Sequence, residues 1–297
     1  MGVSIPPEKI DEAVQATAFV AAACRAEESR QPRPRLVDPL AERFVDASRA
    51  DLTDAKSRAG ARQALVAAGR AEVVERTLLI DELLLTTLGT AGSGTPPVVV
   101  NIGAGFCTRP YRLDLSGCRL VVEVDAAGVI ALKDRLLAGV EASCPVRRLA
   151  VDLRDSAALG QVLGSDELSS GPIVVVTEGV LVYLPEPAVR GLAATLAAAD
   201  RVEWWLADLV SAESAEGMNV VAAQAKAGLR LHGLESLAPF EEAGWATVSY
   251  RPLPTVRTPV GVGARGGWAG PGRHPAAASR RIVDGVVSLR RTPRGRS

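Results

Sequence analysis

The chain has 297 residues, of which 47% are hydrophobic and 23% are charged. This composition is typical of a globular protein with a sizeable core, and it excludes a disulfide-stapled miniprotein, a collagen-like or coiled-coil rod and a disordered chain. The 34 basic residues balance 34 acidic residues, but residues 251–297 contain ten arginines and a single acid, Asp284. Because these arginines are spread among glycine and proline, we expect no nucleic-acid partner.

Cysteine and histidine residues lack the spacing of a metal site. The four cysteines contain no Cys-x-x-Cys pair and the chain has two histidines, so we expect reduced thiols and no bound metal. The most apolar N-terminal stretch, residues 16–24, is too short to span a bilayer and follows acidic residues. These features predict a cytoplasmic protein without a membrane anchor, and no motif indicates an oligomeric state.

The N-terminal third is predicted to be helical. Residues 8–87 place apolar side chains at helical spacing, interrupted by a forced turn at residues 31–35, Gln-Pro-Arg-Pro-Arg. A segment rich in Gly, Ser, Thr and Pro, residues 89–97, ends this region. We therefore expect a helical cap over residues 1–90 and a separate core over residues 91–297.

The core is predicted to alternate strands with helices. The expected strands are residues 98–102, 120–124, 146–151, 173–177 and 202–209, and the expected helices between them are 128–138, 156–163 and 186–199. This alternation predicts a parallel α/β sheet covered by helices on both faces, in a Rossmann-like fold. Such sheets bind ligands at the carboxyl ends of their strands.

The remaining core sequence is less regular. Residues 211–243 predict a helical insertion, and residues 246–250 and 282–289 predict two strands that form an antiparallel hairpin at the sheet edge. The intervening residues 251–281 are rich in Gly, Pro and Arg, which is typical of a long loop.

A glycine pair follows the first predicted strand. At Gly103 and Gly105 the backbone can approach a ligand closely. A dinucleotide-binding fingerprint requires a third glycine, and that position is Thr108, so pyrophosphate binding is not indicated.

Acidic residues end three successive predicted strands. Asp125 ends the second strand 20 residues after Gly105, where a carboxylate can accept hydrogen bonds from two ribose hydroxyls. Asp152 and Leu153 follow the third strand, where an adenine amino group and its ring can be bound, and Glu178 follows the fourth. Charged groups in buried parallel strands are unfavourable without a partner, so this row of acids predicts a ligand site. With no lysine among the acids, a cationic adenosine such as S-adenosylmethionine fits better than a nucleotide.

Six blocks in this order resemble the leucine carboxyl methyltransferase family, including its bacterial polyketide O-methyltransferase branch. The blocks are residues 38–41, 76–81, 103–113, 123–125, 152–155 and 178–185, and the resemblance covers roughly residues 25–210. It implies a class I methyltransferase fold of seven strands, the last two forming a hairpin, with a helical N-terminal cap over an S-adenosylmethionine site.

The resemblance also implies roles for individual residues. Arg76 matches the family arginine that holds the methionine carboxylate, Gly103 and Gly105 match the glycines beside the methionine, and Glu178 matches a glutamate near its amine. Asp125 matches the carboxylate that binds the ribose.

The resemblance also covers the adenine contact, and the chain departs from the family pattern at Cys107. Asp152 with Leu153 matches the adenine contact of the family. Cys107 stands where most members have aspartate in Gly-Ala-Gly-x-Asp-Thr-Arg, and the loss of that acid puts cofactor affinity in doubt. We expect Cys107 to be a small packed thiol, because activation as a nucleophile would need a cationic or basic neighbour.

We expect methyl transfer to an oxygen of a small molecule, with the carboxylate of a natural-product intermediate favoured. A carboxylic acid is already ionised at neutral pH and needs no general base, whereas a phenol would require one, and His232 is then the candidate. Tyr183 is the candidate catalytic residue that contacts the acceptor, or its ring packs beneath the cap. Two alternatives remain open: a nicotinamide-dependent oxidoreductase and a repurposed member that transfers no methyl group.

Overall fold

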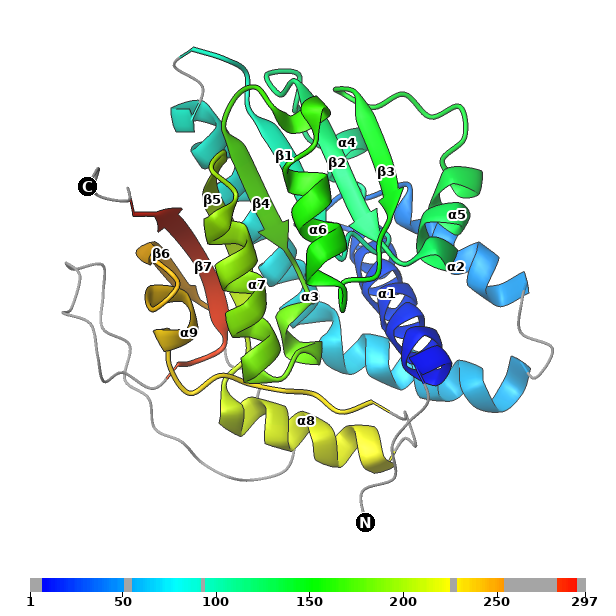
Figure 1. Ribbon diagram of the computed structural model, residues 1–297. Helices are drawn as coiled ribbons and strands as arrows, with labels where there is room; N and C mark the ends of the chain where they lie inside the picture. The colour runs from blue at the N-terminus through cyan, green and yellow to red at the C-terminus, as the bar shows by residue number, and fades with distance from the viewer. Residues whose placement is uncertain (1–6, 51–54, 92–93, 225–228, 254–281, 293–297) are drawn as a thin grey trace.

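The protein was analysed as a computed structural model (Figure 1). The residues that it describes are 7–50, 55–91, 94–224, 229–253 and 282–292. The helices are α1 (Pro7–Ser29), α2 (Ala41–Ala50), α3 (Ala55–Ala91), α4 (Arg109–Arg112), α5 (Ala127–Leu136), α6 (Ser156–Leu163), α7 (Glu186–Ala198), α8 (Ala212–Gln224) and α9 (Ala238–Glu241), with 3-10 turns η1 (Asp166–Leu168) and η2 (Leu181–Tyr183). The strands are β1 (Val98–Ile102), β2 (Leu120–Asp125), β3 (Val146–Ala150), β4 (Ile173–Thr177), β5 (Val202–Leu209), β6 (Trp245–Pro252) and β7 (Gly285–Arg291).

The strands form one seven-stranded sheet in the order β3-β2-β1-β4-β5-β7-β6. The first five strands are parallel, and β7 lies antiparallel between β5 and β6. The predicted α/β class, the seven strands and the antiparallel edge hairpin are therefore confirmed. The chain order reverses direction between β1 and β4, which is where ligands bind in open parallel sheets.

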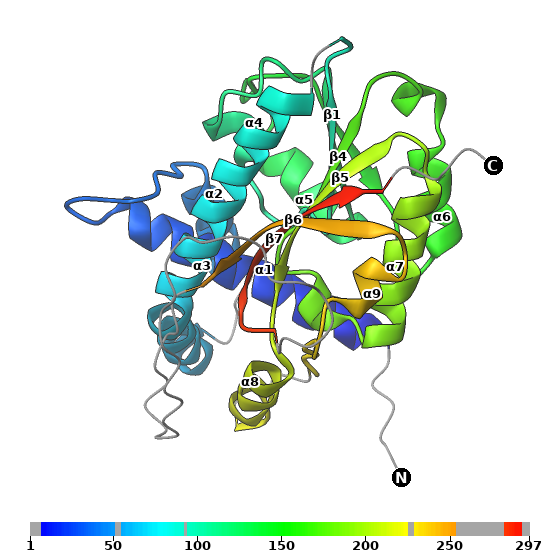
Figure 2. The same cartoon turned by 90° about the vertical axis from the view of Figure 1, so that its left-hand side faces the viewer.

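The sheet separates two hydrophobic cores because successive side chains of a buried strand point to opposite faces. Val98 and Val100 of β1 contribute to the core beneath α6 and α7, where Trp205 and Phe240 pack with ring centroids 5.0 Å apart. Val99 contributes to the opposite core, which α3 covers. Figure 2 shows α3 on one side of the strands and α6 and α7 on the other.

The N-terminal helices lie next to the carboxyl ends of the parallel strands. In Figure 1 the arrowheads of β2 and β4 point toward the side of the molecule where α1 lies. Phe106, in the loop after β1, packs against Phe19 of α1 and Phe44 of α2 with centroid distances of 4.7 and 4.5 Å. α3 ends at Ala91, so it crosses the expected boundary at residue 90. The division into a cap and a core remains a prediction.

Two expected elements differ in the structure. Within the described part of the helical insertion predicted over 211–243, the helices are α8 and the short α9, and residues 229–237 before α9 are not helical. The reason lies at Gly233, where an added Cβ would lie 2.2 Å from the carbonyl oxygen of Ser211, so the chain there runs directly beside the end of β5. β7 begins at Gly285 rather than at residue 282, and most of the predicted loop, residues 254–281, lies outside the described residues. None of the described helices combines the length and the apolar character needed to cross a bilayer.

Candidate functional site

The loop after β1 turns sharply at Gly103. Its φ is +66°, and a Cβ at this position would lie 2.4 Å from Val180 Cγ2. The backbone N–H groups of Gly103 and Ala104 both donate to the Val124 carbonyl oxygen, at 2.8 and 3.1 Å. These contacts fix the glycine turn against the ends of both neighbouring strands, β2 and β4.

Asp125 lies at the carboxyl end of β2 and faces this turn. Its Oδ2 accepts from the Gly105 N–H at 2.6 Å and its Oδ1 accepts from the Ala126 N–H at 2.7 Å. Burial raises the pKa of the Asp125 carboxyl, while the two N–H groups and Lys133 oppose that effect. Each carboxylate oxygen can accept more than one hydrogen bond, so Asp125 keeps capacity for ligand hydroxyls.

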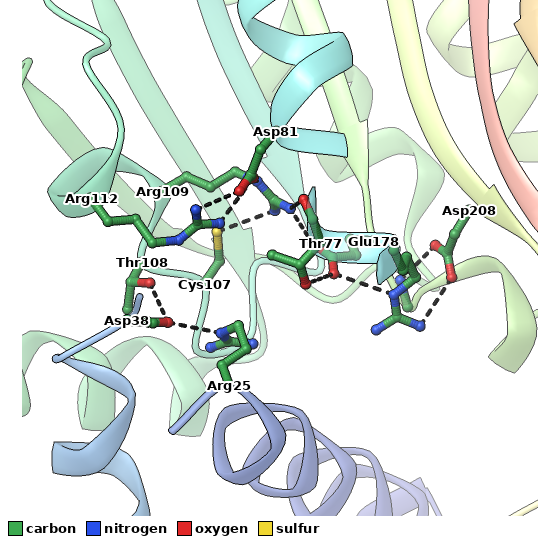
Figure 3. Close-up of polar contacts among 12 residues, drawn as sticks. Arg25, Asp38, Thr77, Asp81, Cys107, Thr108, Arg109, Arg112, Glu178 and Asp208 are labelled. Atoms are coloured by element: carbon green, nitrogen blue, oxygen red, sulfur yellow. Dashed lines mark hydrogen bonds and ion pairs between the residues drawn. The ribbon is translucent and has the colours of Figure 1, made fainter. Parts of the chain in front are cut away.

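Glu178, after β4, is surrounded by donors (Figure 3). Its Oε1 accepts from Thr77 Oγ1 at 2.8 Å and from Arg76 Nε at 3.2 Å, and its Oε2 lies 2.5 Å from Arg109 Nη2. Burial by itself would raise the pKa of Glu178, but Arg109 and Arg76 outweigh it and hold that pKa well below its ordinary value. Glu178 is therefore an anion throughout the neutral range.

Arg109 connects Glu178 to Asp81 of α3. Its Nε donates to Asp81 Oδ1 at 2.6 Å, and Arg112 donates to both oxygens of the same carboxylate. Thr77 and Asp81 are four residues apart and therefore share one face of α3. Figure 3 shows Arg109 between Asp81 and Glu178. Helix α3 thus places a hydroxyl donor, Thr77, and a carboxylate acceptor, Asp81, near the carboxyl ends of the strands.

A second buried ion pair holds α1 against the glycine loop. Asp38 Oδ2 accepts from Arg25 Nε at 2.8 Å and from Thr108 Oγ1 at 2.7 Å. Arg25 Nη2 also donates to the Phe106 carbonyl oxygen at 2.6 Å. Burial would raise the pKa of Asp38, and Arg25 more than compensates, so this pKa is lowered. The loop after β1 is thereby fixed from the N-terminal side.

Asp208 is a site residue that the sequence analysis missed. It lies in β5, one residue before the strand ends; its Oδ1 accepts from the Gly179 N–H at 2.7 Å and its Oδ2 accepts from Arg76 Nη1 at 3.2 Å. The signal was available, because Asp208 is an acid near the end of a parallel strand, as Asp125 is. Arg76 is consequently held between Glu178 and Asp208.

The predicted nucleoside contact at Asp152 is less enclosed. The Val151 N–H donates to the Asp125 carbonyl oxygen at 2.9 Å, which brings this segment next to β2. The Asp152 side chain is 52% exposed and pairs with Arg154 Nε at 2.8 Å, whereas Leu153 packs against the core beneath α6 and α7. The structure thus places Asp152 at the solvent edge of the site.

Tyr183 and Cys107 lie near different members of this cluster of charges: Tyr183 near Arg76 and Asp208, and Cys107 beside Arg109. Tyr183 ends the 3-10 turn after β4, and its side chain is hydrogen-bonded with Thr17 of α1. Burial raises the pKa of Tyr183, so its phenol is protonated at neutral pH. Cys107 Sγ accepts from Arg109 Nη1 at 3.5 Å, so this thiol occupies the remaining side of that guanidinium. All four cysteines are free, and no group of metal-ligating side chains occurs among the described residues.

The sequence profile of the leucine carboxyl methyltransferase family matches residues 18–197. The chain belongs to this family. Of the ion-paired side chains described around the glycine loop and Glu178, only Asp208 lies outside residues 18–197. Most of this site therefore falls within the segment that matches the family.

Curated relatives of this chain are named as candidate S-adenosyl-L-methionine-dependent methyltransferases. A candidate S-adenosyl-L-methionine-dependent methyltransferase of Mycolicibacterium smegmatis is 36% identical over 184 residues, which are 59% of this chain and 59% of that protein. Another from Streptomyces coelicolor is 33% identical over 195 residues, covering 63% of this chain and 62% of that protein. The chain thus matches about three fifths of the length of these two relatives.

Solved structures show the same fold at low sequence identity. A methyltransferase candidate from Thermobifida fusca aligns with a TM-score of 0.53 and 13% identity over 98% of this chain and 100% of that one. A DUF574 family protein from Streptomyces avermitilis aligns with a TM-score of 0.53 and 17% identity, over 93% and 97% of the two chains. The fold that this chain shares with these structures therefore extends beyond residues 18–197.

The lowered pKa of Glu178 predicts an acid-sensitive contribution to folding. A carboxyl whose pKa falls on folding stabilises the native state above its unfolded pKa, here 4.5, and loses that contribution as the pH falls toward the folded value. We expect the free energy of unfolding of the wild type to fall below about pH 4.5, with a slope from this group of at most about 1.4 kcal/mol per pH unit. Urea titrations at several pH values give the free energy of unfolding as a function of pH. Below about pH 4.5 this free energy should fall less steeply with decreasing pH in Glu178→Gln than in the wild type. The same pH dependence in both proteins would contradict this assignment.

Proposed function

We propose that this protein transfers the methyl group of S-adenosylmethionine to an oxygen of a small molecule, with the carboxylate of a natural-product intermediate as the favoured acceptor. One observation carries the proposal: the carboxylates of Asp125 and Glu178 lie at the carboxyl ends of β2 and β4, the two strands that flank β1, and the guanidinium of Arg76 on α3 pairs with Glu178. Membership of a methyltransferase family supports the reaction class and argues against a nicotinamide-dependent oxidoreductase.

The residues at this site match the functional groups of S-adenosylmethionine. Asp125 is a buried acceptor next to the glycine turn, suited to the two ribose hydroxyls. Arg76 uses Nε and Nη1 for Glu178 and Asp208, and a guanidinium has further N–H donors for a carboxylate. The anionic Glu178 is suited to the ammonium group, and Leu153 to the adenine ring.

When bound, S-adenosylmethionine supplies a methyl group on a positively charged sulfur. The chain's own contribution is to hold the cofactor by both ends and to align the acceptor oxygen with the methyl carbon, which can supply several kcal/mol of the barrier reduction. The carboxylates of Glu178 and Asp208 remain near Arg76, so positive charge in the site is balanced before the acceptor binds.

A carboxylate acceptor fits the titration states at this site. Tyr183 is buried, its pKa is raised, and it therefore serves as a neutral hydrogen-bond donor rather than as a base. An acceptor that is already ionised at neutral pH needs no proton removed, so a donor such as Tyr183 can orient it. Tyr183 is thus the proposed catalytic residue that contacts the acceptor.

A phenolic acceptor is the second candidate, and the position of His232 favours it. The His232 backbone N–H donates to the Val182 carbonyl oxygen at 2.7 Å. Val182 directly precedes Tyr183, so this hydrogen bond brings the backbone of His232 close to that of Tyr183. Partial burial, followed by the charge of Arg230, lowers the pKa of His232. A neutral imidazole can act as a general base for a phenol.

Cofactor binding tests the site assignment. Isothermal titration calorimetry with S-adenosylmethionine should show that Asp125→Ala and Arg76→Ala each weaken binding by about tenfold or more, because each leaves a polar group of the ligand unpaired at about 1 to 3 kcal/mol. The matched controls Asp114→Ala and Arg190→Ala remove exposed charges and should bind as the wild type does. Wild-type affinity in both site variants would refute the assignment.

Turnover with methyl-labelled cofactor tests the reaction itself. Panels of small carboxylic acids and phenols should show label transfer to the acids in the wild type and in His232→Asn. Transfer to phenols that is lost in His232→Asn would support the second candidate instead. Cofactor binding without transfer to either panel would favour the repurposed member.

A further inference from the structure

A lysine that the proposed reaction does not use lies fully buried behind Asp125. The Lys133 side chain, on α5, has no exposed surface, and its Nζ lies 2.7 Å from Glu123 Oε1, which is also fully buried. Burying an ammonium group is unfavourable unless it is paired, and a buried ion pair is seldom more stable than an apolar pair of the same size. Stability alone therefore does not explain why this pair occurs here.

The location of the pair suggests its role. Glu123 and Asp125 are two residues apart on β2 and point to the same face of the sheet, so their Cα atoms lie roughly 7 Å apart along the strand. Two neighbouring carboxylates raise each other's pKa. A positive charge on this face therefore favours the ionised form of Asp125 beside Glu123.

Each element packed against this face contributes to its charge balance. Arg148 of β3 donates from Nε to Glu123 Oε2 at 2.8 Å, but it is shared with Asp134 of α5 and with the Tyr111 hydroxyl. Lys133 contacts Glu123 alone among the described acids. Burial raises the pKa of Asp125; the Gly105 and Ala126 N–H groups and the charge of Lys133 lower it, and the charge of Glu123 raises it.

We propose that Lys133 is a positioning residue that offsets the charge of Glu123 and keeps Asp125 ionised, able to accept the ribose hydroxyls of the cofactor. The inference rests on the proposed function, because it takes Asp125 as the ribose-binding carboxylate. Without Lys133, burial and Glu123 both favour the protonated form of Asp125, which can accept fewer hydrogen bonds. Cofactor affinity then falls as the pH is lowered and recovers as it is raised.

Lys133→Met tests this role with two measurements. Carbon-13 NMR of the side-chain carboxyls in cofactor-free protein gives the titration midpoint of Asp125, assigned by comparison with Asp125→Asn. We expect the midpoint to move upward in Lys133→Met. Calorimetry with S-adenosylmethionine should show that, one pH unit below the new midpoint, Lys133→Met binds the cofactor about tenfold more weakly than the wild type, because only about a tenth of the Asp125 carboxyl is ionised at that pH. Above the new midpoint the affinity of Lys133→Met should be near that of the wild type.

Further variants separate this effect from a folding defect. Arg147→Met removes an exposed positive charge from the neighbouring strand and should leave the Asp125 midpoint unchanged. Glu123→Gln should lower the midpoint, and adding Lys133→Met to it should raise the midpoint again, so the comparison holds even if Lys133→Met alone does not fold.

The outcomes distinguish this inference from the proposed function. An unchanged Asp125 midpoint in Lys133→Met, or in the double variant relative to Glu123→Gln, overturns the inference, while tight wild-type binding that is lost in Asp125→Ala leaves the proposed function intact. A shifted midpoint in a protein that binds no S-adenosylmethionine overturns both the cofactor role of Lys133 and the proposed function.

Discussion

Replacing Arg109 by methionine is expected to lower the free energy of unfolding by about 3 kcal/mol, because it removes one partner of a buried ion-pair cluster. Arg109 is 4% exposed and donates to both Asp81 and Glu178. Asp81 keeps Arg112, and Glu178 keeps Arg76 and Thr77, so neither carboxylate is left without a donor. The expected loss is therefore at the low end of the range for a broken buried pair. Urea-induced unfolding near neutral pH measures it.

Arg154→Met is the matched control for this change. It removes the same side chain from an ion pair with Asp152 in which both side chains are about half exposed. Exposed pairs contribute about 0 to 1 kcal/mol, so the control should unfold nearly as the wild type does. Equal losses in the two variants would show that the buried cluster is not what stabilises this end of the sheet.

Gly103→Ala is expected to destabilise the protein by about 3 kcal/mol and to weaken cofactor binding. A side chain in the left-handed region costs about 1 kcal/mol, and the clash with Val180 Cγ2, 2.4 Å from the added Cβ, adds about 1 to 3 kcal/mol. Valine has little freedom to rotate away, so the loop before Tyr183 must shift. Thermal unfolding and calorimetry with S-adenosylmethionine measure the two effects.

Gly139→Ala isolates the backbone part of that cost. Gly139 has a similar φ of +73°, but an added Cβ would have no neighbour within 4 Å. We expect a loss of only about 1 kcal/mol and unchanged binding. The double variant Gly103→Ala with Val180→Ala should recover the part of the loss that comes from the clash. Equal losses of stability in Gly103→Ala and Gly139→Ala would show that close packing of the loop after β1 against Val180 does not contribute to stability.

The regular part of the fold could be predicted from the sequence because its signals are local. The β-branched runs at residues 98–102 and 173–177 form strands with the expected bounds, since fully buried parallel strands require continuous apolar sequence. The turn at residues 31–35 separates α1 from α2 as expected, because proline cannot continue a helix. Acids at strand ends were likewise predicted to gather at one edge of the sheet, and Asp125 and Glu178 lie there.

The pairing of charges could not be predicted, because it depends on side chains that are distant in sequence. Arg109, for example, pairs with Asp81 on α3 and with Glu178 after β4, and neither partner is near it in sequence. The break between α8 and α9 was missed for a similar reason, since the close approach of Gly233 to Ser211 is a tertiary contact.

The ion pairs of α3 also determine how the chain can vary. Arg76, Thr77 and Asp81 precede the first strand, and their partners Glu178 and Arg109 follow it. A cut before β1 would separate Arg76 and Thr77 from Glu178, and Asp81 from Arg109. Exchange of the N-terminal helices between relatives therefore keeps these contacts only where the donor carries the same three side chains.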